Sequence, residues 1–163
     1  MGNQIALQCA AHGYQVNLCD VSEMSLQNGN DAFLRFLSRM VDDGFATADQ
    51  HQSIVDRVYR TTDLTEAASG SDFVLEAITE DISVKRKVFS QLESICPEHV
   101  IFATNSSSIR VSRIESSTER TDRVLNAHFV QPIWKHPFVE LMRGSETSYA
   151  TIRAVESFMK SIG

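Results

Sequence analysis

The chain has 163 residues, of which 42% are hydrophobic and 22% are charged, and its formal net charge is −6. These values are typical of a globular domain with its own core, so the composition argues against a disordered protein. The acidic balance disfavours a nucleic-acid-binding protein, because such domains are usually basic. No apolar run approaches the roughly 18 residues of a membrane span, and no signal-peptide pattern opens the chain. We therefore expect no membrane partner and a cytoplasmic protein, or a protein of the mitochondrial matrix in a eukaryote.

The first twenty residues have the pattern of the second half of a dinucleotide-binding βαβ unit. Gly2 opens an apolar run with helical spacing, Gly13 ends it, and a short β-prone stretch then ends at Asp20. A glycine, a helix, a strand and an acid in this order bind the pyrophosphate and the ribose of a dinucleotide. A carboxylate at Asp20 would repel a 2′-phosphate, which favours NAD over NADP. The alternative is that Asp20 only terminates a strand.

The strand and the glycines that normally precede this pattern do not occur in the chain. In a doubly wound sheet that first strand is central, and its loss would leave buried backbone groups unpaired at about 1–3 kcal/mol each. We therefore expect a fragment of a longer gene product, or another segment that fills the gap.

A pair of helices follows Asp20. Ser22 is a suitable N-cap for a helix over 23–42, and Thr47 and Gln50 form a capping-box pattern that opens a second helix toward Val58. The two helices should form a hairpin.

From residue 72 onward, short β-prone runs alternate with helical patterns, which predicts an α/β fold with a mostly parallel sheet. The expected strands cover 72–77, 99–104, 123–129 and 138–142, and the expected helices cover 83–96, 110–117 and 147–163. In the helix over 83–96, the spacing predicts one buried face that contains Val84, Val88, Leu92 and Ile95. No change of composition indicates a second domain within residues 1–163.

Polar residues gather where two of the expected strands end. Glu76 and Glu80 bracket the end of the strand over 72–77, and Lys85 lies one turn into the next helix. The run 105–108, Asn-Ser-Ser-Ser, ends the following strand. Open α/β sheets bind ligands at this edge, so these residues are candidates for a binding site. The alternatives are a solvated helix face and an ordinary turn.

His128 and Glu140 are the candidates for acid–base chemistry. His128 ends a β-prone run and Glu140 lies in the next expected strand, so a strand–loop–strand return can bring the two side chains together. A carboxylate that holds one ring nitrogen leaves the other nitrogen free to accept a proton. A lone histidine at a strand end is more often structural, and we expect His136 to be a surface residue. No histidine has the spacing of a metal ligand, and Cys9, Cys19 and Cys96 fit free thiols of a reducing compartment.

Taken together, these residues resemble the NAD-binding domain of the L-3-hydroxyacyl-CoA dehydrogenase family. The matching motifs occur in the family's order and cover essentially the whole chain: Met1-Gly2, Asp20, Glu76-Ala77-Ile78-Thr79-Glu80 with Lys85, Asn105-Ser106-Ser107-Ser108, and His128-Phe129-Val130-Gln131-Pro132 with Glu140. The resemblance implies a Rossmann-like, doubly wound sheet with an inserted helical hairpin and without its first strand. It also implies that the family's second, helical domain would begin after Gly163.

The resemblance further implies NAD as the cofactor and an acyl-CoA substrate. His128 would take the proton of the substrate 3-hydroxyl, Glu140 would orient the histidine, and Ser107 would lie near nicotinamide and substrate. The product would be a 3-ketoacyl-CoA, and the full-length protein would be a homodimer. The residues that the resemblance assigns to cofactor binding are Gly2, Asp20, Glu80, Lys85, Asn105, Ser107 and Gln131.

Gln131 stands where the family usually has asparagine, and Trp134, Lys135 and His136 fill the loop that follows. These departures indicate a subfamily with a different substrate. Two other functions therefore stay open: dehydrogenation of a free 3-hydroxy acid of the carnitine or gulonate type, and a non-catalytic NAD-binding module or fragment.

Overall fold

The computed structural model describes all 163 residues, which form two compact units. The first unit contains residues 1–67, 130–137 and 161–163, and the second contains residues 68–129 and 138–160. None of the helices combines the length and apolar character that a membrane span requires.

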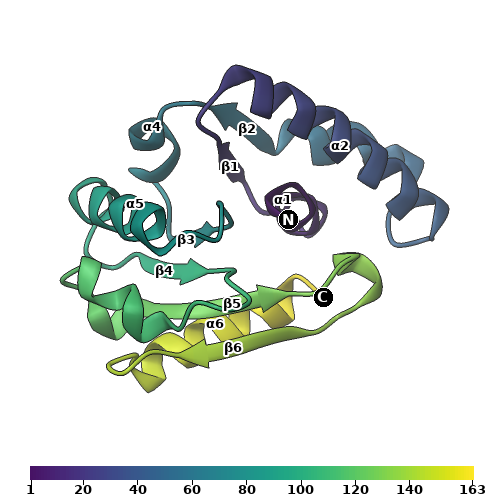
Figure 1. Cartoon of the computed structure of the whole chain (residues 1–163). Coiled ribbons are helices and arrows are strands. Elements are labelled where there is room, and N and C mark those ends of the chain that lie inside the picture. Colours follow the sequence, from purple (N-terminus) through teal and green to yellow (C-terminus); the bar gives the residue numbers. More distant parts are fainter. The chain divides into compact units, whose positions relative to one another are not determined.

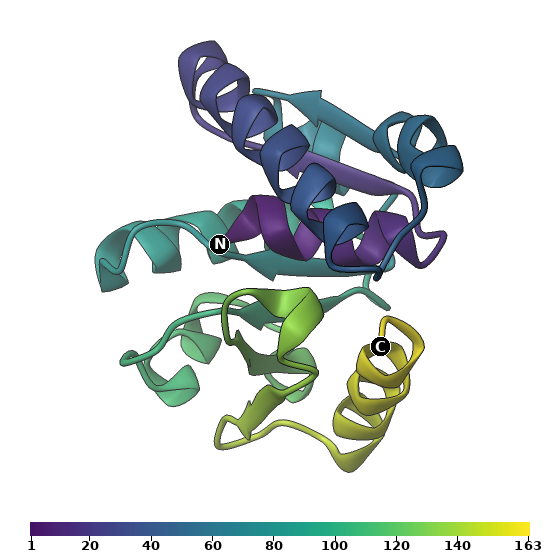
Figure 2. The same cartoon turned by 90° about the vertical axis from the view of Figure 1, so that its right-hand side faces the viewer.

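The first unit contains a two-stranded parallel sheet and the helical hairpin (Figure 1). In chain order its elements are α1 (Gly2–Ala11), β1 (Val16–Cys19), α2 (Glu23–Asp42), a 3-10 turn (Ala48–Gln50), α3 (His51–Asp56) and β2 (Val58–Thr61). Helix α4 (Leu64–Ala68) follows at the boundary with the second unit. Strand β1 pairs with β2 in a register that runs from Val16↔Val58 to Cys19↔Thr61. Helix α1 packs beside α2 (Figure 2).

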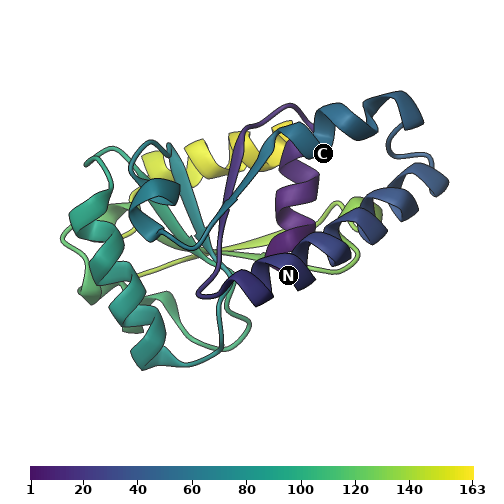
Figure 3. The same ribbon diagram turned by 90° about the horizontal axis from the view of Figure 1, so that it is seen from above.

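The predicted helical hairpin is confirmed (Figure 3). The Ser22 hydroxyl caps α2 by accepting a hydrogen bond from the Ser25 amide, and the capping box of Thr47 and Gln50 is formed. The second helix runs toward Val58 as predicted, as a 3-10 turn and then α3, and it ends at Asp56 because Val58 begins strand β2. The buried residues of β2, Val58 and Thr61, do not alternate with exposed ones, so the sequence pattern did not reveal this strand.

The core of the first unit lies between α1, α2 and α3 and includes one residue from the 130–137 segment. Its buried members are Leu7, Ala10, Phe33, Leu37, Met40, Ala46, Ile54, Val58 and Trp134. Trp134 is only 5% exposed, so its burial in this core anchors the 130–137 segment to the first unit.

The second unit contains a four-stranded sheet in the order β3-β4-β5-β6 (Figure 1). The strands are β3 (Phe73–Glu76), β4 (Ile101–Thr104), β5 (Val124–Phe129) and β6 (Val139–Arg143), and the helices are α5 (Ile82–Ile95) and α6 (Tyr149–Ser161). The first three strands are parallel and β6 runs antiparallel to β5. The predicted α/β alternation with mostly parallel strands is therefore confirmed.

Two expectations for the second unit were wrong in detail. The helix expected over 110–117 is a pair of 3-10 turns, Val111–Arg113 and Glu115–Ser117. The buried face of α5 contains Lys85, Phe89 and Leu92, whereas Val84 is 40% exposed. Leu92 is buried as predicted, whereas Lys85 and Phe89 are buried in place of their neighbours Val84 and Val88.

Candidate functional site

A buried ion pair lies where β3 ends. The Lys85 Nζ of α5 is 2.7 Å from Glu76 Oε1, and both side chains are only 1% exposed. Glu76 also accepts hydrogen bonds from the Thr104 hydroxyl of β4 and from the Ile78 amide, each at 2.7 Å. A buried charge requires such partners, because its desolvation would otherwise cost several kcal/mol. Lys85 is thereby fixed, and its Nζ also lies 3.3 Å from Glu80 Oε2.

Glu80 is held by the loop that follows β4. Its Oε1 accepts hydrogen bonds from the hydroxyls of Ser106 and Ser108 and from the Ser108 amide. Desolvation by burial acts to raise the pKa of Glu80, but these hydrogen bonds and the one from Lys85 outweigh it and lower the pKa to about 2. Glu80 is therefore ionised at neutral pH, and 38% of its side chain is accessible to a ligand.

The low pKa of Glu80 makes a testable contribution to stability. A carboxyl whose pKa is lowered by folding stabilises the fold above its ordinary pKa of about 4.3, and this stabilisation is lost as the pH falls from there toward 2. We expect Ser108→Ala to raise the pKa of Glu80 and Ser107→Ala to leave it unchanged, because Ser107 does not contact Glu80. A carboxyl-carbon NMR titration measures both values, and equal pKa values in the two variants would contradict the assignment.

His128 and Glu140 face each other across the β5–β6 ladder. They are directly paired in the register, and His128 Nδ1 is 2.9 Å from Glu140 Oε2. An ionised carboxylate only accepts hydrogen bonds, so Nδ1 carries the hydrogen and the Nε2 of the neutral ring keeps its lone pair. The His128 side chain is 25% exposed. The expected strand–loop–strand approach is confirmed, and His136 is exposed as expected.

The remaining candidates of the second unit follow β4. Asn105 accepts a hydrogen bond from the Phe129 amide through its Oδ1 at 2.9 Å, which ties the end of β4 to the end of β5. Asn126 donates from Nδ2 to the Ser106 carbonyl oxygen at 2.6 Å and thereby fixes the backbone of the serine loop, residues 105–108. Ser107 is exposed at the tip of this loop. The structure thus leaves the Ser107 hydroxyl accessible, whereas its neighbours Ser106 and Ser108 are engaged with Glu80.

Three candidates lie in the first unit. Gly2 is the first residue of α1, and Asp20 is exposed directly after β1, where its Oδ1 accepts a hydrogen bond from the Val21 amide. Gln131 is exposed in the 130–137 segment and accepts a hydrogen bond from Gln4. No group of histidine, cysteine, aspartate and glutamate side chains could hold a metal ion.

The chain matches, over residues 1–163, the family described as "3-hydroxyacyl-CoA dehydrogenase, NAD binding domain". The chain belongs to this family. A curated relative, the probable 3-hydroxybutyryl-CoA dehydrogenase of Bacillus subtilis, is 33% identical over 163 residues, which is 100% of this chain and 56% of that protein. The chain thus spans little more than half the length of the curated relatives it matches.

Several solved structures have the same fold as this chain. (S)-3-hydroxybutyryl-CoA dehydrogenase from Ralstonia eutropha has a TM-score of 0.94 at 35% identity, and the match covers 100% of this chain and 57% of that chain. A diketoreductase, described as a catalyst acting on dicarbonyl compounds, has a TM-score of 0.95 at 29% identity, with 99% and 57% covered. The Rossmann-like fold expected for the 3-hydroxyacyl-CoA dehydrogenase family is therefore confirmed.

The sequence did not reveal the contacts of several residues that shape this domain of the 3-hydroxyacyl-CoA dehydrogenase family. Glu76 was noted only as an acid at a strand end, and its burial with Lys85 required the tertiary structure. Ser106 and Ser108 were noted only as part of the polar run after β4, and their hydrogen bonds to Glu80 required the tertiary structure. Asn126, which donates to the Ser106 carbonyl oxygen, was not singled out. Gln4 was not singled out from the sequence, and it is only 5% exposed.

Proposed function

We propose that the protein catalyses the NAD-dependent oxidation of an L-3-hydroxyacyl-CoA to a 3-ketoacyl-CoA, with His128 as general base. The observation that carries this proposal is the 2.9 Å contact of His128 Nδ1 with Glu140, which leaves Nε2 as the proton acceptor. Nε2 takes the proton of the 3-hydroxyl, and the Glu140 carboxylate stabilises the imidazolium that forms. NAD, when bound, accepts the hydride from C3, so the alcohol loses two electrons to the nicotinamide and one proton to His128.

The residues present fit NAD. The N-terminus of α1 at Gly2 offers unpaired backbone amides to a pyrophosphate, and the exposed Asp20 carboxylate offers acceptors to ribose hydroxyls. In the second unit, the ionised Glu80 and the accessible Ser107 hydroxyl are proposed to contact the nicotinamide side. Lys85 is almost fully buried, so its proposed role is to fix Glu80. The proposed role of Asn105 is to fix the loop that follows β4.

The assignment of Asp20 predicts a change in cofactor preference. Asp20→Ala should weaken NADH binding by about 10- to 100-fold, because a hydrogen bond to a charged group is worth roughly 1.5–3 kcal/mol. The same change should improve NADPH binding relative to NADH, since it removes the charge that repels a 2′-phosphate. Titration of the nucleotide fluorescence measures both dissociation constants, with Glu23→Gln as the control for loss of a nearby exposed acid. An unchanged NADH affinity in Asp20→Ala would rule out the ribose contact.

The proposed activity is tested with the protein as its gene encodes it. We expect NADH oxidation, followed at 340 nm, with acetoacetyl-CoA and little turnover of free acetoacetate or dehydrocarnitine. Tight NADH binding without turnover of any of these compounds would instead indicate the non-catalytic alternative.

A free 3-hydroxy acid is the second candidate substrate. It is favoured by Gln131, which replaces the family's usual asparagine, and by the similarity to a diketoreductase whose described substrates are dicarbonyl compounds. Turnover of a free keto acid but not of acetoacetyl-CoA would select this candidate.

A homodimer is the assembly that we propose, and light scattering on the gene-encoded protein measures it. A monomeric mass at micromolar concentration would contradict the proposal. We also propose that the protein lies in the cytoplasm, or in the mitochondrial matrix in a eukaryote.

A further inference from the structure

Two hydrogen bonds tie the serine loop to β5, one on each side of His128. Asn126, two residues before His128, donates from Nδ2 to the Ser106 carbonyl oxygen at 2.6 Å. Phe129, the residue after His128, donates its backbone amide to Asn105 Oδ1 at 2.9 Å. Because both donors belong to the strand that carries His128, these two bonds fix the loop relative to the histidine.

The bond from Asn126 acts on the residue that the serine loop presents to a ligand. The Ser106 carbonyl belongs to the peptide group that joins Ser106 to Ser107, and a peptide group is planar. A donor on its oxygen therefore fixes the plane of this group and, with it, the orientation of the Ser107 backbone. Ser107 itself is exposed, whereas the Ser106 hydroxyl donates to Glu80.

Asn126 and His128 share one face of the sheet. Side chains alternate along a strand, so residues two apart point to the same side. In the register, Asn126 lies opposite Thr104 of β4, the last residue before the serine loop. Asn126 is buried, with only 3% of its surface exposed. One face of β5 thus carries the proposed proton acceptor and, next to it, the residue that holds the serine loop.

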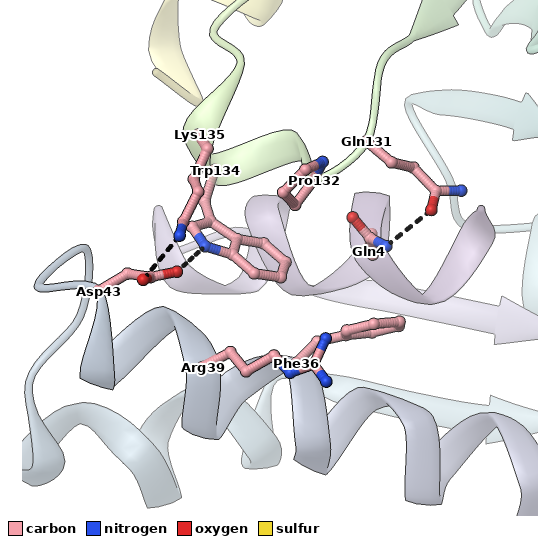
Figure 4. Close-up of a pocket in the computed structure, with 8 residues that line it drawn as sticks. All are labelled: Gln4, Phe36, Arg39, Asp43, Gln131, Pro132, Trp134 and Lys135. Atoms are coloured by element: carbon pink, nitrogen blue, oxygen red, sulfur yellow. Dashed lines mark hydrogen bonds and ion pairs between the residues drawn. The ribbon is translucent and has the colours of Figure 1, made fainter.

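A buried amide side chain normally uses both of its ends. Gln4 of the first unit, which is also buried, accepts a hydrogen bond from the Ile133 amide through Oε1 at 3.2 Å. Its Nε2 donates to Gln131 Oε1, also at 3.2 Å (Figure 4). Asn126 differs, because its Oδ1 is buried and has no hydrogen-bond partner in the protein.

The unpaired oxygen of Asn126 follows from its bond to the serine loop. A carbonyl oxygen can only accept, so the amide must turn its Nδ2 toward Ser106, and this orientation leaves Oδ1 without a partner. An unpaired buried oxygen destabilises the fold, and alanine at this position would bury none. The need for a donor to the Ser106 carbonyl therefore accounts for the asparagine, and the packing of the sheet does not.

We propose that Asn126 is a positioning residue that sets the place of the Ser107 hydroxyl relative to the His128 imidazole. The inference rests on the proposed dehydrogenase activity, in which these two groups meet the reacting parts of the substrate and the cofactor. Asn126 touches neither of these molecules and acts through the peptide group between Ser106 and Ser107. A displacement of about 1 Å in such a group can lower a rate about 10²-fold.

A double-variant cycle tests this role with the protein as its gene encodes it. We would measure kcat/KM for acetoacetyl-CoA reduction in Asn126→Ala, in Ser107→Ala and in the double variant. Asn126→Ala alone should lower kcat/KM by about 10- to 100-fold. In the Ser107→Ala background the same substitution should lower it by less than about twofold, because the position of residue 107 no longer matters once its hydroxyl is gone.

Asn17→Ala is the matched control. Asn17 of β1 also donates from Nδ2 to a backbone carbonyl oxygen, that of Ala67, at 2.9 Å, so its replacement removes the same kind of bond away from the serine loop. We expect little change in kcat/KM for this variant. Thermal unfolding checks that each variant is folded, and Asn126→Ser repeats the cycle if Asn126→Ala is not.

The outcomes separate this inference from the proposed function. If Asn126→Ala lowered kcat/KM by the same factor with and without the Ser107 hydroxyl, the asparagine would serve folding alone, and the inference would be wrong while the dehydrogenase activity stood. If only a free keto acid is turned over, the same cycle is measured with that compound. A wild-type protein that turned over neither acetoacetyl-CoA nor a free keto acid would overturn the proposed function and this inference together.

Discussion

Replacing His128 with asparagine should lower kcat for acetoacetyl-CoA reduction by about 10²- to 10⁴-fold, the usual contribution of a positioned acid–base group. The loss should appear in kcat and in kcat/KM alike, with little change in NADH affinity, because the proton transfer occurs only in the transition state. Stopped-flow and steady-state measurements at 340 nm give these constants. The control is His136→Asn, which removes an exposed imidazole of the following segment.

Glu140→Gln tests the other half of the pair. An amide can present its oxygen to His128 Nδ1, so the geometry survives while the charge that stabilises the imidazolium is lost. We expect an intermediate loss in kcat, smaller than that of His128→Asn. If His128→Asn and His136→Asn had the same kcat, His128 would not be the base.

Replacing Lys85 with methionine should destabilise the fold by about 3–5 kcal/mol, because the buried Glu76 carboxyl loses its ion-pair partner. Urea unfolding followed by far-ultraviolet circular dichroism measures this loss. Methionine is similar in length to the lysine stem, so the effect reports on the charge more than on packing.

The double variant Glu76→Gln with Lys85→Met is the matched control. It removes both charges, and replacement of a whole buried ion pair is often close to neutral. We therefore expect the double variant to be clearly more stable than Lys85→Met alone. If the loss in the double variant equalled the sum of the losses in Lys85→Met and in Glu76→Gln alone, the pair would not be coupled.

The sequence predicted the parts of this molecule that depend on local signals. Ser22 was identified as a cap because its hydroxyl acts within one helical turn, and the structure has that bond. The approach of His128 to Glu140 was predictable because a strand, a short loop and a returning strand leave few other geometries. The fold class followed from the alternation of these elements.

Other features depend on contacts between distant residues and gave no local signal. Lys85 interrupts the apolar spacing of α5, and only the buried Glu76 on β3 explains a lysine in a core. Gln4 lies within an apolar helix face, and its partner Gln131 is 127 residues away in the chain. Buried and exposed residues do not alternate along the short strand β2, and its pairing with β1 stabilises it.

The pairing of β5 with β6 has a consequence for how proteins of this kind can change. His128 meets Glu140 because the two residues are opposite each other in the ladder, and the register follows from the strands themselves. The spacing of twelve residues between them is therefore incidental. An insertion or deletion within 130–137 would keep the pair intact, whereas a single added residue inside β6 would turn Glu140 to the opposite face of the sheet. The segment that carries Gln131 and Trp134 can thus diverge in length and composition while the contact of His128 with Glu140 is kept.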